Sequence, residues 1–220
     1  MRKLLLLRPQ PGLTESASRA AELGLEVIAR PLFQVEPVNW QAPDPNNYDA
    51  LLLTSANAVR HAGKAMKKVS GLPVFAVGSA TAEAALEAGL TLAGSGRGGV
   101  TRLLQDVPET LRLLHLAGEH RRKIESRHSI DSLTVYRSAA IGEPGLPPLQ
   151  GLVAAVHSPR AAVRLAQLAA VRDQTAIAAI SLNAANACGR GWERVEVAAA
   201  PGDPSLLALA AMLCHTSAPG

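Results

Sequence analysis

Aromatic residues are scarce in this 220-residue chain, where Phe, Trp and Tyr together make up 3% of the sequence. Proteins that bind single-stranded nucleic acid stack bases on several exposed rings, so the scarcity argues against such a surface. Basic residues gather in segments 60–68 and 120–128, but no aromatic residues are interleaved with them. We therefore expect solvated helix faces at these segments, and no nucleic-acid partner.

Cysteines and long apolar runs are also few. Cys188 and Cys214 are the only cysteines, and their spacing fits neither a metal site nor a disulfide framework, which favours a reducing, cytoplasmic compartment. The six histidines show no HxxxH or HExxH spacing, so no metal is expected. No run approaches the roughly 18 apolar residues of a membrane span, and the four leucines near the start are too few for a secretory leader. We expect no membrane association.

Hydrophobic residues make up 48% of the chain and charged residues only 18%, so a sizeable core is available. The length fits one large or two small α/β units. Basic residues outnumber acidic ones by 22 to 18, a formal charge of +4. This modest excess suits an anionic small molecule as well as a polyanion.

Short apolar runs alternate with alanine-rich stretches along the chain. This rhythm predicts βαβ units and mainly parallel sheets, with helices such as 15–23, 79–88 and 161–171 between the strands. The predicted strands cover residues 3–7, 26–29, 50–53, 74–77, 90–93, 112–116, 132–135, 152–156, 176–180 and 194–197.

Two proline-rich segments, 30–47 and 138–151, interrupt the rhythm and are predicted to be domain crossings. The first 30 or so residues are too few to bury a core alone. We therefore predict a discontinuous first lobe, residues 1–34 plus 146–220, and an inserted second lobe, residues 35–145.

An internal repeat supports two similar lobes. LLLTSANAVR at 51–60 aligns with 154–164 and places Ser55 on Ser158, while 75–84 aligns with 178–187 and places Gly78 on Ser181. Both alignments share one offset of 103 residues.

In each repeated segment a predicted strand runs into a small polar loop and then a helix: TSAN, GSAT, HSPR and SLNA. Backbone N–H groups at helix N-termini favour carboxylates or phosphates, and such loops lie at the ligand-binding edge of a parallel sheet. The alternative is ordinary N-capping by Ser55, Ser79 or Ser158.

The segment Gly-Ser-Gly-Arg-Gly-Gly at 94–99 satisfies the dinucleotide pattern GxGxxG, and Glu119 follows 20 residues later. The preceding strand is brief and the following helix, predicted at 100–106, is barely two turns. A flexible, anion-tolerant loop is the competing interpretation.

Tyr136 ends the predicted strand LTVYR at the start of the second crossing, where we expect the lobes to face one another. A strand tyrosine can simply pack. Its phenol can instead donate a hydrogen bond or a proton to a leaving group.

Short motifs that match one protein family occur in order along the whole chain. It resembles the uroporphyrinogen-III synthase family nearly end to end. The motifs that carry the resemblance are Arg8-Pro9 after the first strand, TSxNAV from Thr54 to Val59, AVGxxTAxxLxxxG from Ala76 to Gly89, Leu116 to Arg121, Val135-Tyr136-Arg137, His157-Ser158-Pro159, and Gly191 to Ala198 with Pro201 and Ser205-Leu206.

The resemblance implies two parallel-sheet α/β lobes joined by a two-stranded linker, with the first lobe discontinuous. It also implies a reaction without a cofactor, in which linear hydroxymethylbilane loses water, closes, and inverts ring D to give uroporphyrinogen III in haem biosynthesis. The bilane closes spontaneously to the type I isomer, so the enzyme steers the reaction by binding its transition states. Its substrate carries eight carboxylates, and we expect a monomer.

By resemblance Tyr136 assists departure of the hydroxyl. The expected substrate-binding residues are Arg8, Pro9, Ser55, Asn57, Gly78, Ser79, Thr81, Gly118, Arg121, Ser158, Arg160, Ser181 and Asn183.

The chain departs from the family pattern at Ala117, where Arg is usual, at His120, where Gly is usual, and at Ala184, where a hydroxyl is usual. These departures leave two alternatives open. One is a non-catalytic two-lobed binder of an anionic metabolite, and the other is a nucleotide-dependent enzyme that uses 94–99.

Overall fold

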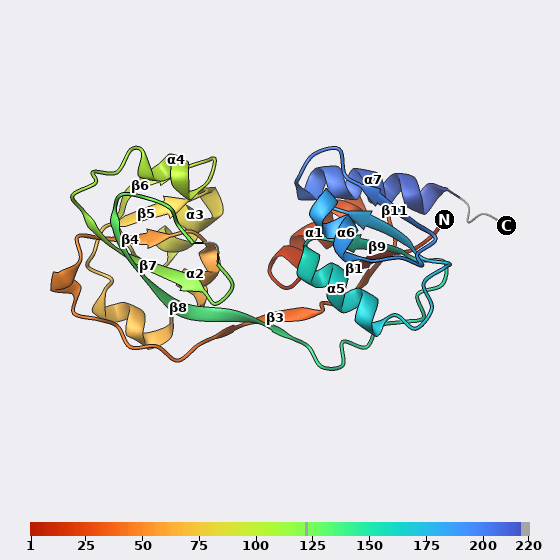
Figure 1. Ribbon diagram of the computed structural model, residues 1–220, viewed down its shortest axis with the longest axis horizontal. Coiled ribbons are helices and arrows are strands. Elements are labelled where there is room, and N and C mark those ends of the chain that lie inside the picture. Colours follow the sequence, from red (N-terminus) through yellow and green to blue (C-terminus); the bar gives the residue numbers. More distant parts are fainter. Residues whose placement is uncertain (122, 217–220) are drawn as a thin grey trace. The chain divides into compact units, whose positions relative to one another are not determined.

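The computed structural model describes residues 1–121 and 123–216 (Figure 1). The chain folds into two compact units. Unit 1 comprises Met1–Gln34 and Ala140–Gly220, and unit 2 comprises Val35–Ala139. Each unit is built around its own sheet with helices packed on both faces.

The sheet of unit 1 has five strands in the order β11-β10-β9-β1-β2, and every neighbouring pair is parallel. Parallel strands need helical crossovers, which explains why the chain alternates strand and helix here. The strands are β1 (Leu4–Leu6), β2 (Val27–Ala29), β9 (Val153–Val156), β10 (Ala176–Ala179) and β11 (Arg194–Val197).

Alternate side chains of these strands enter two separate cores. Leu4 and Leu6 pack with α1 (Gly12–Glu22) and α7 (Asp203–His215), while Leu5 and Leu7 pack with helices of the opposite face. Those helices are α5 (Pro159–Leu168) and α6 (Leu182–Ala187). The near-continuous apolar strands are thus explained by burial on both faces.

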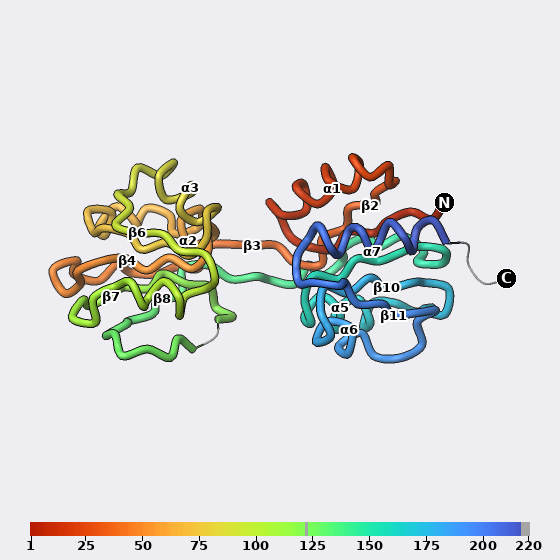
Figure 2. Tube along the Cα trace, turned by 90° about the horizontal axis from the view of Figure 1, so that it is seen from above, coloured from red at the N-terminus to blue at the C-terminus, as the bar shows by residue number. Residues whose placement is uncertain are grey.

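The N-terminus lies beside the last turns of α7 in both views of the chain (Figures 1 and 2). The Arg2 N–H donates to the Cys214 carbonyl at 2.9 Å. The Arg2 guanidinium is buried and pairs with Glu193 at 2.8 Å, which ties the first strand to the far edge of the same unit.

The second sheet has six strands in the order β3-β8-β7-β4-β5-β6. Strands β4 to β8 form parallel pairs. The strands are β3 (Phe33–Pro37), β4 (Ala50–Leu53), β5 (Val74–Val77), β6 (Leu92–Gly96), β7 (Arg112–Gly118) and β8 (Ser129–Ala140).

Helices cover both faces of this sheet as well. Leu51 and Leu53 of β4 face one core, and Ala50 and Leu52 face the other. The helices of unit 2 are α2 (Ala56–His61), α3 (Ser79–Glu87) and α4 (Val100–Leu104), with the 3-10 turns η1 (Pro45–Asn47) and η2 (Gly63–Lys68).

The α/β class and the largely parallel sheets are confirmed, and a strand overlaps each of the ten predicted positions. Strand β6 is shifted to Leu92–Gly96 from the predicted 90–93. The prediction missed β3, because segment 30–47 contains prolines that argued against a strand. Pro37 ends β3, at the edge of the sheet, where a missing N–H breaks no ladder. Strand β8 is also longer than predicted and continues to Ala140.

Residues 140–145 belong to unit 1, although the sequence pattern predicted that they are part of the inserted lobe. The reason is a backbone hydrogen bond of 2.9 Å from the Ile141 N–H to the Leu32 carbonyl. The two crossings therefore run through strands β3 and β8 and not through loops.

Candidate functional site

The order of strands in unit 1 reverses between β1 and β9, because β2 lies beyond β1 while β10 and β11 lie beyond β9. Ligands of open α/β sheets bind outside the carboxyl ends of the strands at such a point. Arg8 follows β1 there, and His157 follows β9. The edge of the sheet where a ligand is expected thus carries a guanidinium and an imidazole.

Both side chains meet the carboxylate of Asp203, the first residue of α7. Asp203 Oδ1 accepts from His157 Nε2 at 2.8 Å, from Ser16 Oγ at 2.6 Å and from Arg8 Nη1 at 3.1 Å. Its other oxygen, Oδ2, accepts from Arg19 Nη1 at 2.7 Å. We call these five residues the Asp203 cluster.

The electrostatics of the cluster favour an ionised carboxylate beside a neutral imidazole. Burial opposes ionisation of Asp203, but hydrogen bonds from Ser16, His157 and Arg19 outweigh it and lower its pKa to about 2. Burial lowers the pKa of His157 despite the Asp203 hydrogen bond. The ring donates through Nε2 to the Asp203 carboxylate.

Arg8 lies tightly against the first turn of α1. A Cβ on Gly12 would lie 2.4 Å from Arg8 Nη2, so only glycine leaves room for the guanidinium. Arg8 is therefore held by Asp203, Ser16 and Gly12, with a side-chain exposed fraction of 27%. The neighbouring Pro9 carbonyl accepts the Leu13 N–H at 3.1 Å and so belongs to the turn that starts α1.

The remaining predicted residues of unit 1 follow β9 and β10. Ser158 Oγ accepts the Ala161 N–H at 3.2 Å and Ser181 Oγ accepts the Ala184 N–H at 3.3 Å, so both hydroxyls cap their own helices. Asn183 is exposed. The guanidinium of Arg160 lies 4.7 Å from the centre of the Phe33 ring, a cation–π contact.

In unit 2 the strand order reverses between β4 and β7. Gly118 ends β7, and Tyr136 lies beside it within β8, which continues to Ala140, so Tyr136 does not end its strand as predicted. The half-buried Tyr136 ring lies directly over Gly118, where a Cβ would be only 2.7 Å from Tyr136 Cζ. Arg121 donates to the Gly118 carbonyl at 3.0 Å and to Thr134 Oγ1 at 2.8 Å. The His61 ring centre is 6.4 Å from that of Tyr136.

The loops after β4 and β5 hold the other predicted residues of unit 2. Ser55 Oγ caps α2 by accepting the Asn57 N–H at 3.2 Å. Gly78 has a φ of 84° and its N–H donates to the Gly96 carbonyl at 2.8 Å, so the positive φ explains the glycine. Ser79 is exposed, whereas Thr81 is 5% exposed and packs inside the unit.

Gly78 and Ser181 occupy equivalent positions of the internal repeat, in the loops after β5 and β10, but their backbone conformations differ. Ser181 has an extended φ of −160°. The two loops therefore present their N–H groups differently.

Sequence reasoning missed His115, which is 2% exposed in β7. Its Nε2 lies 3.0 Å from Thr54 Oγ1 and its Nδ1 lies 3.0 Å from Ser132 Oγ. Burial lowers the pKa of His115 to about 4, so the ring is neutral at pH 7. The sequence signal for this buried set of hydrogen-bonding side chains is a lone histidine inside an apolar strand, LLHL.

The nucleotide interpretation of residues 94–99 is wrong. Gly94 and Gly96 lie within β6, which runs from Leu92 to Gly96, and not in a loop after it. A Cβ at either position would approach Phe75 or Leu103 to 3.2 Å, so both glycines serve packing. The following helix α4 has five residues.

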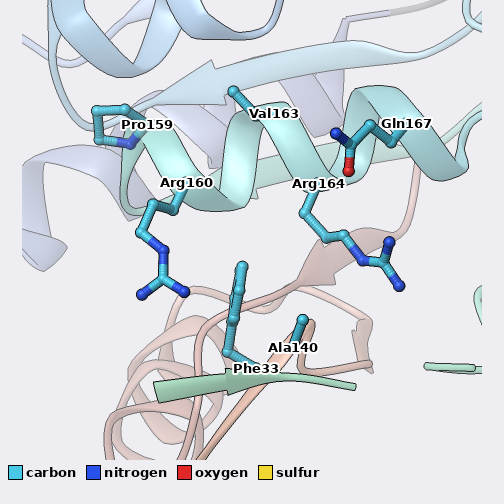
Figure 3. Close-up of a pocket in the computed structure, with 7 residues that line it drawn as sticks. All are labelled: Phe33, Ala140, Pro159, Arg160, Val163, Arg164 and Gln167. Carbon is cyan, nitrogen blue, oxygen red and sulfur yellow. The ribbon is translucent and has the colours of Figure 1, made fainter. Parts of the chain in front are cut away.

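A pocket of about 400 Å³ lies between α5 and the segments that carry Phe33 and Ala140, within unit 1 (Figure 3). Its lining residues come from α5 and from the ends of the crossing strands: Phe33, Ala140, Pro159, Arg160, Val163, Arg164 and Gln167. Among the described residues no group of three His, Cys, Asp or Glu side chains is placed to hold a metal. A search of the same residues for a helix able to span a membrane found none.

The profile of one protein family, described as uroporphyrinogen-III synthase HemD, matches residues 14–208. The chain belongs to the uroporphyrinogen-III synthase family. The match extends over most of unit 1 and all of unit 2. The family resemblance seen in the motifs is thus confirmed.

Solved structures agree with this membership at the level of the fold. A uroporphyrinogen-III synthetase from Helicobacter pylori aligns over 97% of this chain and 100% of its own, with a TM-score of 0.69 and 16% identity. A mutant uroporphyrinogen-III synthase from Thermus thermophilus aligns over 96% of this chain and 99% of its own, with a TM-score of 0.51 and 19% identity. A search among curated protein sequences gave no match.

Two of the departures from the family pattern lie at buried positions. Ala117 is 2% exposed within β7 and Ala184 is 0% exposed in α6. Neither position presents a side chain to a ligand here. The backbone N–H of Ala184 is itself used by the Ser181 cap.

Proposed function

We propose that this chain is a carbon–oxygen lyase that converts hydroxymethylbilane to uroporphyrinogen III, acting as a cytoplasmic monomer without a cofactor. The observation that carries the proposal is the family match over residues 14–208, which takes in the polar loops after β4, β5, β7, β9 and β10. The activity, the closure of a linear tetrapyrrole with loss of water, is the one for which the family is named.

Tyr136 is the residue to which we assign a catalytic role. Its phenol can donate a hydrogen bond to the departing hydroxyl, and a donor that matters only as the bond breaks lowers the barrier. Gly118 supports this assignment, because the absence of a side chain there fixes the ring over the end of β7. Arg121, anchored on the Gly118 carbonyl and Thr134, adds a positive charge beside the same strand end.

The eight carboxylates of the substrate require donors and positive charge spread over a wide surface. Helix α3, of nine residues, starts at the end of β5 without a side-chain cap, so its first N–H groups point outward with no capping side chain. Helix α5 starts with Pro159, which lacks an N–H, and its Ala161 N–H is bound by Ser158, so fewer of its first N–H groups are left for a ligand. Because Ser55, Ser158 and Ser181 cap their own helices, each hydroxyl is engaged and each occupies one helix N–H. We therefore assign carboxylate binding to the N–H groups that these caps leave and to arginines. Holding the bilane in one folded conformer is what directs closure toward the type III isomer.

A coupled assay tests the proposal. Freshly generated hydroxymethylbilane is mixed with the protein, the products are oxidised, and type I and type III uroporphyrins are separated by chromatography. We expect mostly type III, and a Tyr136→Phe variant at least about tenfold slower, the equivalent of about 1.4 kcal/mol. Tyr48→Phe, which removes a phenol that pairs with Asp131 at 2.9 Å, is the matched control.

Each outcome of the assay decides one part of the proposal. Type III product from an unimpaired Tyr136→Phe variant would keep the function and make the tyrosine a packing residue. Type I alone, at the spontaneous rate, would refute the enzyme and leave a two-lobed binder of an anionic metabolite.

A further inference from the structure

The pocket on α5 combines a positively charged rim with an apolar floor. Arg160 and Arg164 stand one helical turn apart, and Figure 3 shows both side chains extending from α5 toward Phe33 and Ala140. None of the lining residues is acidic. The pocket therefore attracts anions.

Arg164 is held in place by backbone carbonyls and not by a carboxylate. Its Nη2 donates to the Ile141 carbonyl at 3.1 Å and to the Gly142 carbonyl at 3.0 Å. Within residues 1–121 and 123–216 it forms no ion pair, and its buried Nε has no hydrogen-bond partner. Its charge is thus held in position by carbonyl groups, without a carboxylate partner among these residues, and an anion in the pocket would supply one.

The floor of the pocket is apolar. Phe33 is 8% exposed beneath the Arg160 guanidinium, and Pro159, Val163 and Ala140 add further apolar lining. A guanidinium prefers the face of an electron-rich ring, and an apolar floor suits a flat ring with a charged arm. The volume of about 400 Å³ is near the lower end of the range of roughly 300–1,000 Å³ for small-molecule sites.

We propose that this pocket is a subsite for one carboxylated pyrrole ring of the substrate, an inference that rests on the proposed function. A space of this size takes a single ring with its two acidic arms and not all four rings. Arg160 and Arg164 bind the carboxylates, and the apolar floor receives the ring. The subsite adds Arg164, Phe33 and Gln167 to the residues that determine which substrates bind.

The test changes the charge of the rim at the exposed Gln167, and the Glu variant does so with a side chain of the same shape. Gln167→Glu places a carboxylate in the pocket, and Gln167→Lys places an ammonium there. Gln150→Glu makes the same chemical change at another exposed position of unit 1, outside the pocket. A monopyrrole with two carboxylate arms is titrated into each protein and followed by NMR, and KM and kcat for hydroxymethylbilane are measured in parallel.

We expect Gln167→Glu to weaken monopyrrole binding and to raise KM by roughly fivefold or more, with kcat nearly unchanged. Gln167→Lys should bind at least as tightly as the wild type, and Gln150→Glu should match the wild type. Chemical-shift changes should be centred on α5. Equal effects of Gln167→Glu and Gln150→Glu, or equal losses in the Glu and Lys variants, would overturn the subsite.

The failure of the subsite and the failure of the proposed function are distinguishable. If the wild type makes type III product while Gln167→Glu is normal in both measurements, the subsite is wrong and the function stands. If the wild type has no turnover yet binds the monopyrrole with the expected charge dependence, the function fails and an anion-binding pocket remains.

Discussion

Replacing Asp203 with Asn removes the negative charge that Arg8, Arg19 and His157 share, and it leaves a side chain of nearly the same size. The carboxylate is 11% exposed, and its pKa falls from 3.8 to about 2 on folding. A shift of this size corresponds to about 2 kcal/mol of folding free energy at pH 7. We therefore expect Asp203→Asn to lower the free energy of unfolding by about that amount.

The sign of the pH dependence follows from the direction of the shift. Because the folded pKa lies below the unfolded one, the stabilisation is complete above about pH 4 and disappears as the pH falls through about 2. The difference between the wild type and Asp203→Asn should therefore shrink to about 1 kcal/mol at pH 3. Asp173→Asn, at an exposed position of the same unit, should differ from the wild type by less than about 0.5 kcal/mol.

The two tryptophans allow the units to be followed separately. Trp192 is 9% exposed in unit 1 and donates to the Cys188 carbonyl at 3.0 Å, whereas Trp40 belongs to unit 2. Urea unfolding in a Trp40→Phe background, followed by fluorescence, reports unit 1 alone. A loss that is the same for Asp203→Asn and Asp173→Asn, or that does not change between pH 7 and pH 3, would refute the electrostatic argument.

Two further predictions concern unit 2. Gly118→Ala places a methyl group 2.7 Å from Tyr136 Cζ and should lower kcat about as much as Tyr136→Phe does. The control is Gly71→Ala, because the space around its new Cβ is open. Full activity of Gly118→Ala would contradict the assigned position of the Tyr136 ring. Burial lowers the pKa of His115 to about 4, so this histidine binds a proton more readily in the unfolded chain than in the folded one. The free energy of unfolding should therefore fall by about 3 kcal/mol as the pH drops from 6.5 to 4. Unfolding followed by Trp40 should show a slope roughly 1.4 kcal/mol per pH unit steeper in the wild type than in His115→Gln, and equal slopes would contradict a neutral buried ring.

Much of the fold can be predicted from local patterns. Runs such as LLLL and AIAA are buried on both faces, and only strands inside covered parallel sheets fit such runs in so short a length. Serines directly after strands predicted helix starts, and Ser55, Ser158 and Ser181 are all helix caps. These features are local, because a strand face or a cap depends on residues only a few positions away.

The contacts of the candidate site cannot be predicted from such local patterns. The aspartate at 203 offers no sequence motif, yet it binds Arg8 across 195 positions of the chain. The pairing depends on the strand order of unit 1, which brings the ends of β1 and β9 to the start of α7. Hydrophobic periodicity reports which face of a strand is buried, but it does not report which strand lies beside it.

Patterns within the sequence predict the alternation of strands and helices, the two α/β lobes, the family, and the positions of the polar loops after the strands. The strand orders, the strand character of the crossings, the packing role of Gly94 and Gly96, and the partners of Arg8, Arg164 and His115 follow only from the folded chain. The difference lies in the range of the interactions. Periodicity and capping act within a few residues, whereas ion pairs, glycine contacts and sheet order join segments that only the folded chain brings together.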